Sequence, residues 1–190
     1  MRDRLKINEI FYSVQGEGAN AGMPAVFVRL SGCNLKCKFC DTSHERYKEF
    51  DIAELEKRIS KFKCRNIIWT GGEPTLQLTA DILKYFVKYY NCIETNGSNP
   101  VPEGVDYITC SPKVGIEVLN LNFPAGVHEI RYPVGVDDAV PDIEMLPPAK
   151  YYYVSPIDVI KENTDYCLKL IKRNPRWRLS VQIHKLLKIR

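Results

Sequence analysis

The chain has 190 residues, is 45% hydrophobic and carries a formal net charge of +4 from 27 basic and 23 acidic side chains. A chain of this length can bury one substantial core, so we expect a single domain over residues 1–190. The mild charge gives no ground for nucleic-acid binding, because a solvated chain end explains the basic stretch 185–190. No apolar run approaches the ~20 residues of a membrane-spanning helix, and no signal segment follows Met1, so we expect a cytoplasmic protein.

The first half of the chain alternates strand-like and helix-like segments. Residues 25–30 are apolar and β-branched, which predicts a strand. Asp51 and Glu54 have the spacing of a capping box, and apolar residues follow at helical intervals, so a helix is predicted over 51–62. The other elements predicted here are a strand over 66–70, a helix that begins after Thr79 and a strand over 91–95.

The second half continues the alternation and defines the fold class. One helix is predicted over 162–173, and no element is predicted for the Pro- and Asp-rich region 133–150. Strand-like runs are predicted over 105–110, 127–132, 151–154 and 177–183. Strands that alternate with helices in this way indicate an α/β fold with a mainly parallel sheet.

Glycine, proline and small polar residues follow the predicted strands. Such residues are common in any turn, so no single group indicates a site. In a parallel barrel or part-barrel, however, the strand ends open onto one face, where the active site lies. The groups are Gly71-Gly72-Glu73-Pro74, Thr95-Asn96-Gly97, Ser111-Pro112-Lys113 and Ser155-Pro156-Ile157-Asp158, together with a cysteine loop after the strand 25–30.

That loop contains three cysteines within eight residues, Cys33-Asn-Leu-Lys-Cys37-Lys-Phe-Cys40. Three thiolates can hold three irons of a cubane cluster and leave the fourth iron without a protein ligand. An open iron can take part in chemistry, whereas a closed four-cysteine site mainly carries electrons or supports structure. Small and polar residues on both sides suit a loop that wraps a cofactor and offers it backbone N–H groups.

Disulfides and zinc are the alternatives for these cysteines. Disulfides are rare in the reducing compartment expected for this chain. Zinc usually takes four ligands in paired spacing, and the other four cysteines are single and scattered. Each of those four is predicted to be a small buried hydrophobe: Cys64, Cys92, Cys110 and Cys167. An iron–sulfur cluster is favoured, although spacing alone does not fix the metal.

The CxxxCxxC loop, Gly71-Gly72-Glu73-Pro74 and the strand–helix alternation resemble the radical S-adenosylmethionine (SAM) enzymes. Within that superfamily the chain resembles the 7-carboxy-7-deazaguanine synthases from about residue 7 to its end. The resemblance implies a trimmed, partial TIM-like barrel. The motifs that carry it are Phe11-Tyr-Ser-Val-Gln15-Gly16-Glu17-Gly18, Phe27-Val-Arg29-Leu, Cys40-Asp41-Thr42, Glu94-Thr95-Asn96-Gly97, Ser111-Pro112-Lys113 and Gln182-Ile-His184-Lys.

The resemblance implies a carbon–nitrogen lyase of queuosine- or archaeosine-type deazapurine biosynthesis. Such an enzyme converts 6-carboxy-5,6,7,8-tetrahydropterin to 7-carboxy-7-deazaguanine with loss of ammonia. A [4Fe-4S] cluster and SAM supply a 5′-deoxyadenosyl radical that takes the hydrogen from C6 of the pterin, and the ring then contracts. The hydrogen returns at the end, so that SAM is regenerated.

The resemblance also assigns cofactor-binding residues. Cys33, Cys37 and Cys40 would hold the cluster. Gly72 has no Cβ and lets backbone approach the methionine end of SAM, while Glu73 can accept a bond from its ammonium group. The residues implied for SAM are Phe39, Cys40, Asp41, Gly72, Glu73, Gly97, Ser111, Pro112, Lys113, Ser155, Pro156, Ile157 and Asp158. At the position of Ser155, relatives often carry Gln.

For the pterin, the resemblance implies seven residues: Val14, Gln15, Gly16, Arg29, Thr95, His184 and the terminal Arg190. Gln15 can both donate and accept, as the edge of a pterin requires. The guanidinium of Arg29 suits a carboxylate, although a structural ion pair with Glu17 is the alternative. His184 could equally be a satisfied core histidine.

The resemblance implies that Thr42 binds Mg²⁺ together with substrate and water, because this ion keeps several waters and takes few protein ligands. The alternative is a helix or loop N-cap. A trimmed barrel leaves sheet edges uncovered, so we expect a homodimer. A flavodoxin- or ferredoxin-like electron donor is also expected.

Two other functions stay open from the sequence. One is a radical SAM activase that generates a glycyl radical on a partner enzyme. The other is a non-enzymatic iron–sulfur or zinc module, which would need a fourth protein ligand, and Cys64 is the only further cysteine near in sequence.

Overall fold

The computed structural model describes residues 4–40, 42–158 and 160–189 and divides the chain into two compact parts. The first part is built from the segments Met1–Ser13, Pro24–Thr95 and Asn99–Ile108. The second part is built from Val14–Met23, Asn96–Ser98 and Thr109–Arg190. In the described ranges, no helix is long and apolar enough to cross a membrane. A single domain over residues 1–190 stays a prediction.

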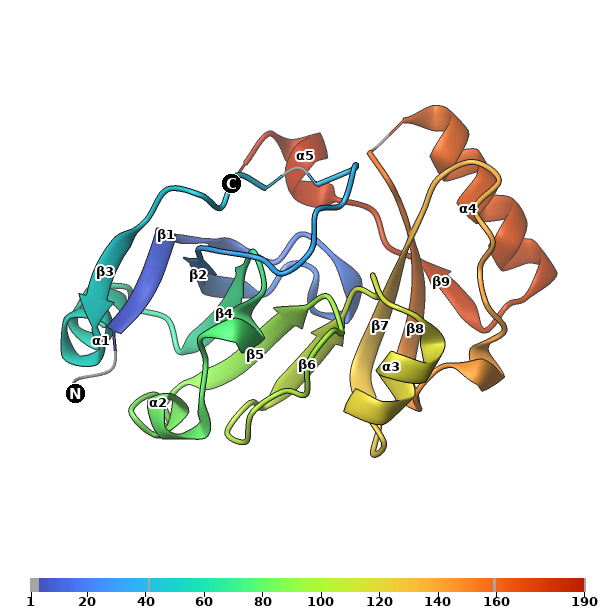
Figure 1. Cartoon of the computed structure of the whole chain (residues 1–190). Coiled ribbons are helices and arrows are strands. Elements are labelled where there is room, and N and C mark those ends of the chain that lie inside the picture. The colour runs from blue at the N-terminus through green and yellow to red at the C-terminus, as the bar shows by residue number, and fades with distance from the viewer. Residues whose placement is uncertain (1–3, 41, 159, 190) are drawn as a thin grey trace. The chain divides into compact units, whose positions relative to one another are not determined.

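In the first part the strands follow the order β3-β1-β2-β4-β5-β6 (Figure 1). Their bounds are Arg4–Val14 for β1, Pro24–Leu30 for β2, Lys48–Asp51 for β3, Asn66–Gly71 for β4, Tyr90–Thr95 for β5 and Tyr107–Cys110 for β6. β3 pairs antiparallel with β1. β2, β4 and β5 run parallel, with Leu30 opposite Gly71 and Trp69 opposite Ile93. The carboxyl ends of these three strands therefore lie at one edge.

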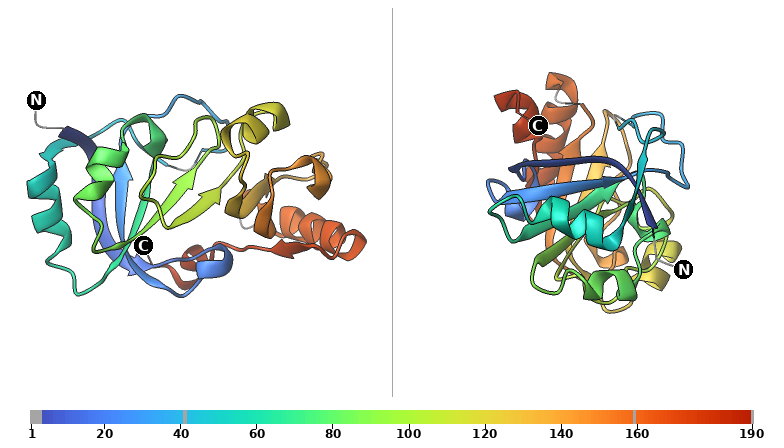
Figure 2. Two further views of the ribbon diagram at one scale, coloured as in Figure 1. Left: turned by 90° about the horizontal axis from the view of Figure 1, so that it is seen from below. Right: turned by 90° about the vertical axis from the view of Figure 1, so that its left-hand side faces the viewer.

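Two short helices cover one face of these strands. The helix α1 (Ile52–Ile59) begins with the predicted capping box, in which the Glu54 N–H donates to Asp51 and the Asp51 N–H donates to Glu54. The helix α2 (Ala80–Lys84) is capped by Thr79. Both helices lie on one side of the β1 and β2 ribbons in the right-hand view of Figure 2. Their apolar faces pack with alternate residues of the strands into one buried cluster, because side chains on a strand alternate between its two faces.

In the second part β6 is followed by β7 (Val127–Val134), β8 (Ala149–Pro156) and β9 (Trp177–Leu179), all paired in parallel. The helix α4 (Lys161–Arg173) lies alongside β8 and β9 (Figure 1). Two shorter helices complete this part, α3 (Ile116–Asn122) and α5 (Ile183–Leu187).

The strand series begins at β3 and ends at β9, so the sheet is open. The prediction of an α/β fold with a mainly parallel sheet that stops short of a full barrel is confirmed. The strand predicted over 177–183 is wrong in its second half, since β9 stops at Leu179 and a helix begins at Ile183. Among the α-helices and strands of the described residues, four have no counterpart in the predictions: β1, β3, α3 and α5.

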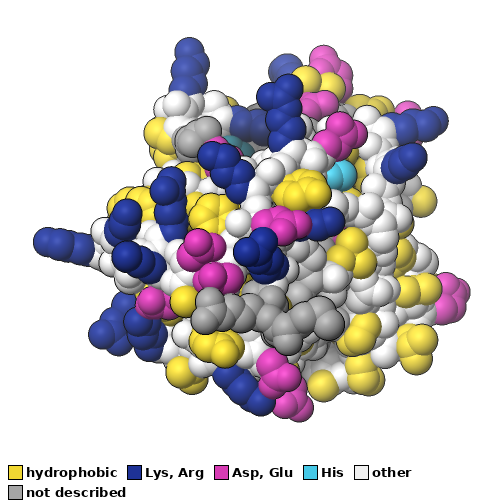
Figure 3. All heavy atoms as spheres, turned by 60° about the vertical axis from the view of Figure 1, so that its left-hand side comes forward, with side chains coloured by type: hydrophobic (Ala, Val, Ile, Leu, Met, Phe, Trp, Pro, Cys, Tyr) yellow, Lys and Arg dark blue, Asp and Glu magenta, His cyan; other side chains and the backbone are white. Residues whose placement is uncertain are grey.

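The surface carries charges of both signs. On the face drawn in Figure 3, Lys and Arg side chains are interspersed with Asp, Glu and apolar side chains. This mixture agrees with the small net charge of +4.

A buried amide ties β4 to β5. Asn91 is 1% exposed, and its Oδ1 accepts a hydrogen bond from Trp69 Nε1 at 3.0 Å. Its Nδ2 donates to the carbonyl oxygens of Phe86 and Tyr89 at 3.0 and 3.1 Å. The Asn91 amide, the Trp69 N–H and the two backbone carbonyls are thereby all paired, which buried polar groups require. The amide thus joins two neighbouring strands whose carboxyl ends carry candidate site residues.

We expect Asn91→Leu to lower the free energy of unfolding by roughly 3 kcal/mol, because the Trp69 N–H and two backbone carbonyls lose their partner while buried. Urea unfolding of the purified protein measures this change. Asn120→Leu is the matched control, since Asn120 is exposed and donates one bond to the Met145 carbonyl. Its expected effect stays within about 0.5 kcal/mol. Equal losses in the two variants would contradict the role assigned to Asn91.

Candidate active site

The cysteine loop follows β2 in the first part of the structure, and its described residues up to the start of β3 contain no helix or strand (Figure 1). Cys33 and Cys37 are partly buried, and Cys40 is exposed. All seven cysteines are free thiols, so the disulfide alternative finds no support. Burial is confirmed for Cys92, Cys110 and Cys167, whereas the prediction is wrong for Cys64, which is partly exposed. The Cys64 thiol donates instead to the Pro24 carbonyl at 3.3 Å.

Among the described residues, no three His, Cys, Asp or Glu side chains are grouped so as to hold a metal ion. The loop nevertheless offers the chemistry that a cluster ligand needs. The Leu35 N–H donates to the Cys33 sulfur at 3.4 Å, and such a bond stabilises a thiolate. A turn in which the Cys40 N–H donates to the Cys37 carbonyl at 3.2 Å joins the other two cysteines. The donor set therefore fits an iron–sulfur group.

The end of β4 lies directly against the start of this loop. The Gly72 N–H donates to the Leu30 carbonyl at 3.1 Å, and the Glu73 N–H donates to the Gly32 carbonyl at 2.9 Å. A Cβ on Gly72 would lie 1.9 Å from the Gly32 carbonyl oxygen, so no other residue fits at this position. These backbone bonds place Gly72 and Glu73 beside Cys33.

The Glu73 side chain is fully buried behind the contact. Its Oε1 accepts from the Thr75 N–H at 3.1 Å, from the Thr75 hydroxyl at 2.7 Å and from the Thr95 hydroxyl at 2.8 Å. Thr95 is the last residue of β5, so this carboxylate joins the ends of β4 and β5. Glu73 was assigned to SAM from the sequence and Thr95 to the pterin, and the structure places these two side chains in direct contact.

Arg29, on β2, lies near Thr42. The guanidinium Nη1 donates to the Thr42 hydroxyl at 3.5 Å. Its Nε lies 3.7 Å from Glu9, and the group sits over the Phe11 ring. The suggested structural pair with Glu17 is wrong, because Arg29 pairs with Glu9 and Glu17 pairs with Arg131 in the second part. Thr42 precedes no helix, so the helix N-cap alternative finds no support.

In the second part, the structure brings Gly16 against His184. A Cβ on Gly16 would lie 2.2 Å from His184 Nδ1, which shows how closely the imidazole packs on the backbone. The Gly16 carbonyl accepts from the Ile183 N–H at 3.0 Å. Gln15 is 8% exposed, and its Oε1 accepts from the Glu17 N–H at 3.1 Å. Gly16 and His184, which are far apart in sequence, thus lie in direct contact.

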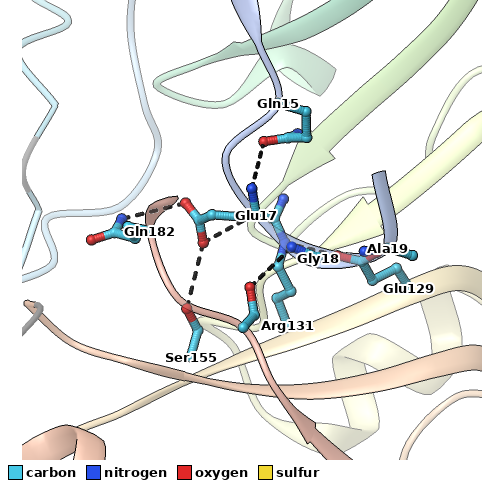
Figure 4. Close-up of polar contacts among 9 residues, drawn as sticks. Gln15, Glu17, Gly18, Ala19, Glu129, Arg131, Ser155 and Gln182 are labelled. Atoms are coloured by element: carbon cyan, nitrogen blue, oxygen red, sulfur yellow. Dashed lines mark hydrogen bonds and ion pairs between the residues drawn. The ribbon is translucent and has the colours of Figure 1, made fainter. Parts of the chain in front are cut away.

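Figure 4 shows a charged network around Glu17, the residue that follows Gly16 along the chain. Arg131 is 3% exposed; its Nη1 lies 3.1 Å from Glu17 Oε2 and its Nε 3.0 Å from Glu129 Oε1. Glu129 and Arg131 are not among the site residues predicted from the sequence. Two charged residues two positions apart in a strand lie on one face, and this spacing is the signal that points to them.

The remaining residues assigned to SAM lie mostly at strand ends of the second part. The Asn96 carbonyl accepts from the Lys113 N–H at 3.1 Å, and the Gly97 carbonyl accepts from Asn122 Nδ2 at 2.9 Å. The Ser155 hydroxyl donates to Glu17 Oε2 at 3.4 Å. Phe39 is 40% exposed in the first part. Asp41 and Arg190 lie outside the described residues.

The family model of the radical SAM superfamily matches residues 27–189, which defines the class of protein. A 7-carboxy-7-deazaguanine synthase of Bacteroides thetaiotaomicron is 43% identical over 97% of this chain and 98% of its own length. That of Haemophilus influenzae is 37% identical over 97% and 94%. The crystal structure of QueE from Escherichia coli superposes with a TM-score of 0.77 at 25% identity over 95% of each chain. The chain belongs to the 7-carboxy-7-deazaguanine synthase family of radical SAM proteins.

Membership of the radical SAM superfamily implies a [4Fe-4S] cluster and SAM as cofactors. The donor set of the cysteine loop fits the cluster, and the end of β4 lies against the start of this loop. The relatives described above are named as synthases, and they give no support to the alternative of a glycyl-radical activase.

We expect Gly72→Ala to reduce iron loading severely, because the added methyl group forces the end of β4 away from the backbone that leads into Cys33. Overpacking of this kind costs about 1–3 kcal/mol or more. Iron and sulfide per chain after anaerobic reconstitution measure the effect. Gly115→Ala is the control, since its nearest atom is a flexible Glu117 oxygen at 3.1 Å. Full iron loading of Gly72→Ala would refute the importance of this contact.

We also expect thiol alkylation to separate two groups of cysteines. Burial raises the pKa of the Cys92 thiol to about 12 and that of Cys167 to about 11. At pH 8, far below both values, these thiols stay protonated and unreactive. Iodoacetamide added to the cluster-free folded protein should modify Cys33, Cys37 and Cys40 first, as read by mass spectrometry. Protein unfolded in urea is the control, and there all seven should react. Modification of Cys92 as fast as Cys40 in the folded protein would be the contrary result.

Proposed function

We propose that this chain converts 6-carboxy-5,6,7,8-tetrahydropterin to 7-carboxy-7-deazaguanine. The observation that carries the proposal is the near full-length similarity to named synthases, reaching 43% identity over 97% of the chain. In this reaction the pterin ring contracts, one carbon–nitrogen bond breaks and ammonia leaves. The substrate equals the product plus ammonia, so no external oxidant is consumed.

The thiolates of Cys33, Cys37 and Cys40 would hold the cluster. When bound, the cluster and SAM supply the one-electron chemistry that removes a hydrogen atom from the substrate. The backbone around Gly72 packs against the loop that carries Cys33, so this part of the chain would fix the methionine end of SAM beside the cluster. Glu73 would accept a hydrogen bond from the SAM ammonium group, because a buried carboxylate is stabilised by a cation.

Further residues are proposed to bind SAM on the basis of the family resemblance. Phe39 would lie beside the adenine. The other residues in this proposal are Cys40, Asp41, Gly97, Ser111, Pro112, Lys113, Ser155, Pro156, Ile157 and Asp158. The Lys113 N–H and Asn122 bonds to the 96–97 backbone hold part of this set in place within the second part.

The pterin would be bound through its carboxylate and its polar edge. The guanidinium of Arg29 would hold the carboxylate. The Thr95 hydroxyl donates to Glu73, and this bond would fix the Thr95 side chain beside the pterin. The contact of His184 with Gly16 supports a shared role for residues 14–16 and 184. Arg190 would complete the set.

Mg²⁺ would bind at Thr42, with water and the substrate carboxylate as its other ligands. The 3.5 Å contact between Thr42 and Arg29 supports this assignment, because both side chains would then meet one carboxylate. The ion would orient that carboxylate and stabilise negative charge during the rearrangement. We further propose a homodimer, an electron donor of the flavodoxin or ferredoxin type and a cytoplasmic location.

Anaerobic turnover tests the proposal. The reconstituted protein should form 7-carboxy-7-deazaguanine when SAM, a reductant, Mg²⁺ and the pterin are supplied, with many products per SAM consumed because the hydrogen returns to the cofactor. Liquid chromatography with mass spectrometry quantifies both compounds. Cys37→Ala is the control variant and should lose both cluster and turnover. Stoichiometric consumption of SAM without any deazapurine would reject the proposed reaction.

A further inference from the structure

Two buried charged residues of the strand β7 bind the loop of residues 15–18 and the residue that follows it. Glu129 and Arg131 lie two positions apart on β7 and are 2% and 3% exposed. They face the same side because residues i and i+2 of a strand share a face. Burying charges this deeply is costly unless they are paired and hydrogen-bonded. The groups that pair with Glu129 and Arg131 offset this cost, and they show which part of the chain these two residues hold in place.

Glu129 fixes the far end of the loop. Its Oε2 accepts from the Ala19 N–H at 2.8 Å. Gly18 has a φ of +66°, and a Cβ there would lie 1.9 Å from Glu129 Oε1. Only glycine combines this backbone angle with so close an approach, so Gly18 allows the backbone of the loop to contact the Glu129 carboxylate. The Gly18 N–H donates to the Ser180 hydroxyl at 3.0 Å, which anchors the same turn to the chain after β9.

Arg131 connects this anchor to Glu17. Its guanidinium lies between the two carboxylates, at 3.0 Å from Glu129 and 3.1 Å from Glu17 (Figure 4). The planar guanidinium directs its donors at fixed angles, so it sets the position of Glu17 relative to β7. A shift of the Glu17 side chain would break its ion pair with Arg131, and the guanidinium would keep its ion pair with Glu129.

Glu17 in turn contacts two other segments. Its Oε2 accepts from the Ser155 hydroxyl at 3.4 Å, at the end of β8, and its Oε1 accepts from Gln182 Nε2 at 3.3 Å. Gln182 directly precedes the helix α5, which carries His184 against Gly16. One guanidinium therefore sets the relative positions of three segments to which the proposed function assigns pterin or SAM contacts.

We propose that Arg131, acting through Glu17, is a positioning residue for substrate. It sets the positions of Gln15 and Gly16 against His184, so that the pterin is held where hydrogen transfer to and from it stays coupled to product formation. This inference rests on the proposed function. Arg131 touches neither ligand; it acts by fixing the carboxylate that aligns the residues that do.

Steady-state turnover of the anaerobic holoenzyme tests this inference in two variants. Glu17→Gln keeps the shape of the side chain and leaves Arg131 paired with Glu129, so it is expected to fold. Arg131→Gln removes the shared cation. In both, kcat/KM for the pterin should fall roughly 10²-fold, the loss that a misplacement of about 1 Å can cause. The ratio of 5′-deoxyadenosine to deazapurine should rise, because a misplaced pterin leaves SAM cleavage unproductive.

A purely structural role would lower the active fraction, measured as iron per chain, while leaving the pterin KM and the product ratio unchanged. The double variant should be no worse than the more impaired single variant, because residues that act through one contact are not additive. Arg176→Gln is the control, since it removes an exposed ion pair with Glu144 in the same part of the chain. The control should keep the wild-type pterin KM and ratio.

Wild-type KM and ratio in Glu17→Gln would overturn the inference even if Arg131→Gln failed to fold. Additive losses in the double variant would also overturn it. If the wild-type holoenzyme itself formed no deazapurine, the proposed function would fall, and this inference with it. An active wild type with unaffected variants would overturn the inference alone.

Discussion

The first part of the structure depends on a backbone contact that tolerates no side chain. Where β4 ends, the N–H groups of Gly72 and Glu73 donate to the carbonyls of Leu30 and Gly32, and a Cβ at position 72 would overlap the Gly32 oxygen. This contact continues the parallel pairing of β2 and β4 past the end of the strands. The cysteine loop, which has no regular structure of its own, thereby gains a fixed starting point. A loop meant to hold a cofactor needs such rigid support.

The second part relies on charge instead of close backbone packing. Arg131 lies between Glu17 and Glu129 with almost no exposed surface. An apolar cluster of the same volume would often stabilise a protein as well or better. What the ionic network adds is a link between separate segments, because the Arg131 guanidinium lies within 3.1 Å of Glu17 and 3.0 Å of Glu129. The buried charges hold the 15–18 loop in one position on β7, which an apolar cluster would not do as specifically.

Much of the site could be predicted from the sequence because its motifs are short and local. The spacing of Cys33, Cys37 and Cys40, the Gly71-Gly72-Glu73-Pro74 turn and the capping box at Asp51 each lie within a few residues. The network around Arg131 could not be predicted in the same way. Its members come from four separate segments, and the sequence of the strand 127–132 does not indicate which carboxylates will pair with the guanidinium. The strand predicted over 177–183 failed for a similar reason, since the Ile183 N–H bonds to the Gly16 carbonyl and the chain turns into a helix there.

The sequence by itself determined the α/β class, the three-cysteine loop that favours an iron–sulfur cluster, and the family. These properties follow from periodicity, from ligand spacing and from motifs whose residues are neighbours along the chain. Only the tertiary structure decided the partners of the buried charges: Arg29 with Glu9, Glu17 with Arg131, and Glu73 with Thr95. The physical reason is that a buried charge pairs with whatever the packed strands bring within about 3–4 Å, and that distance depends on register and strand order rather than on separation along the chain.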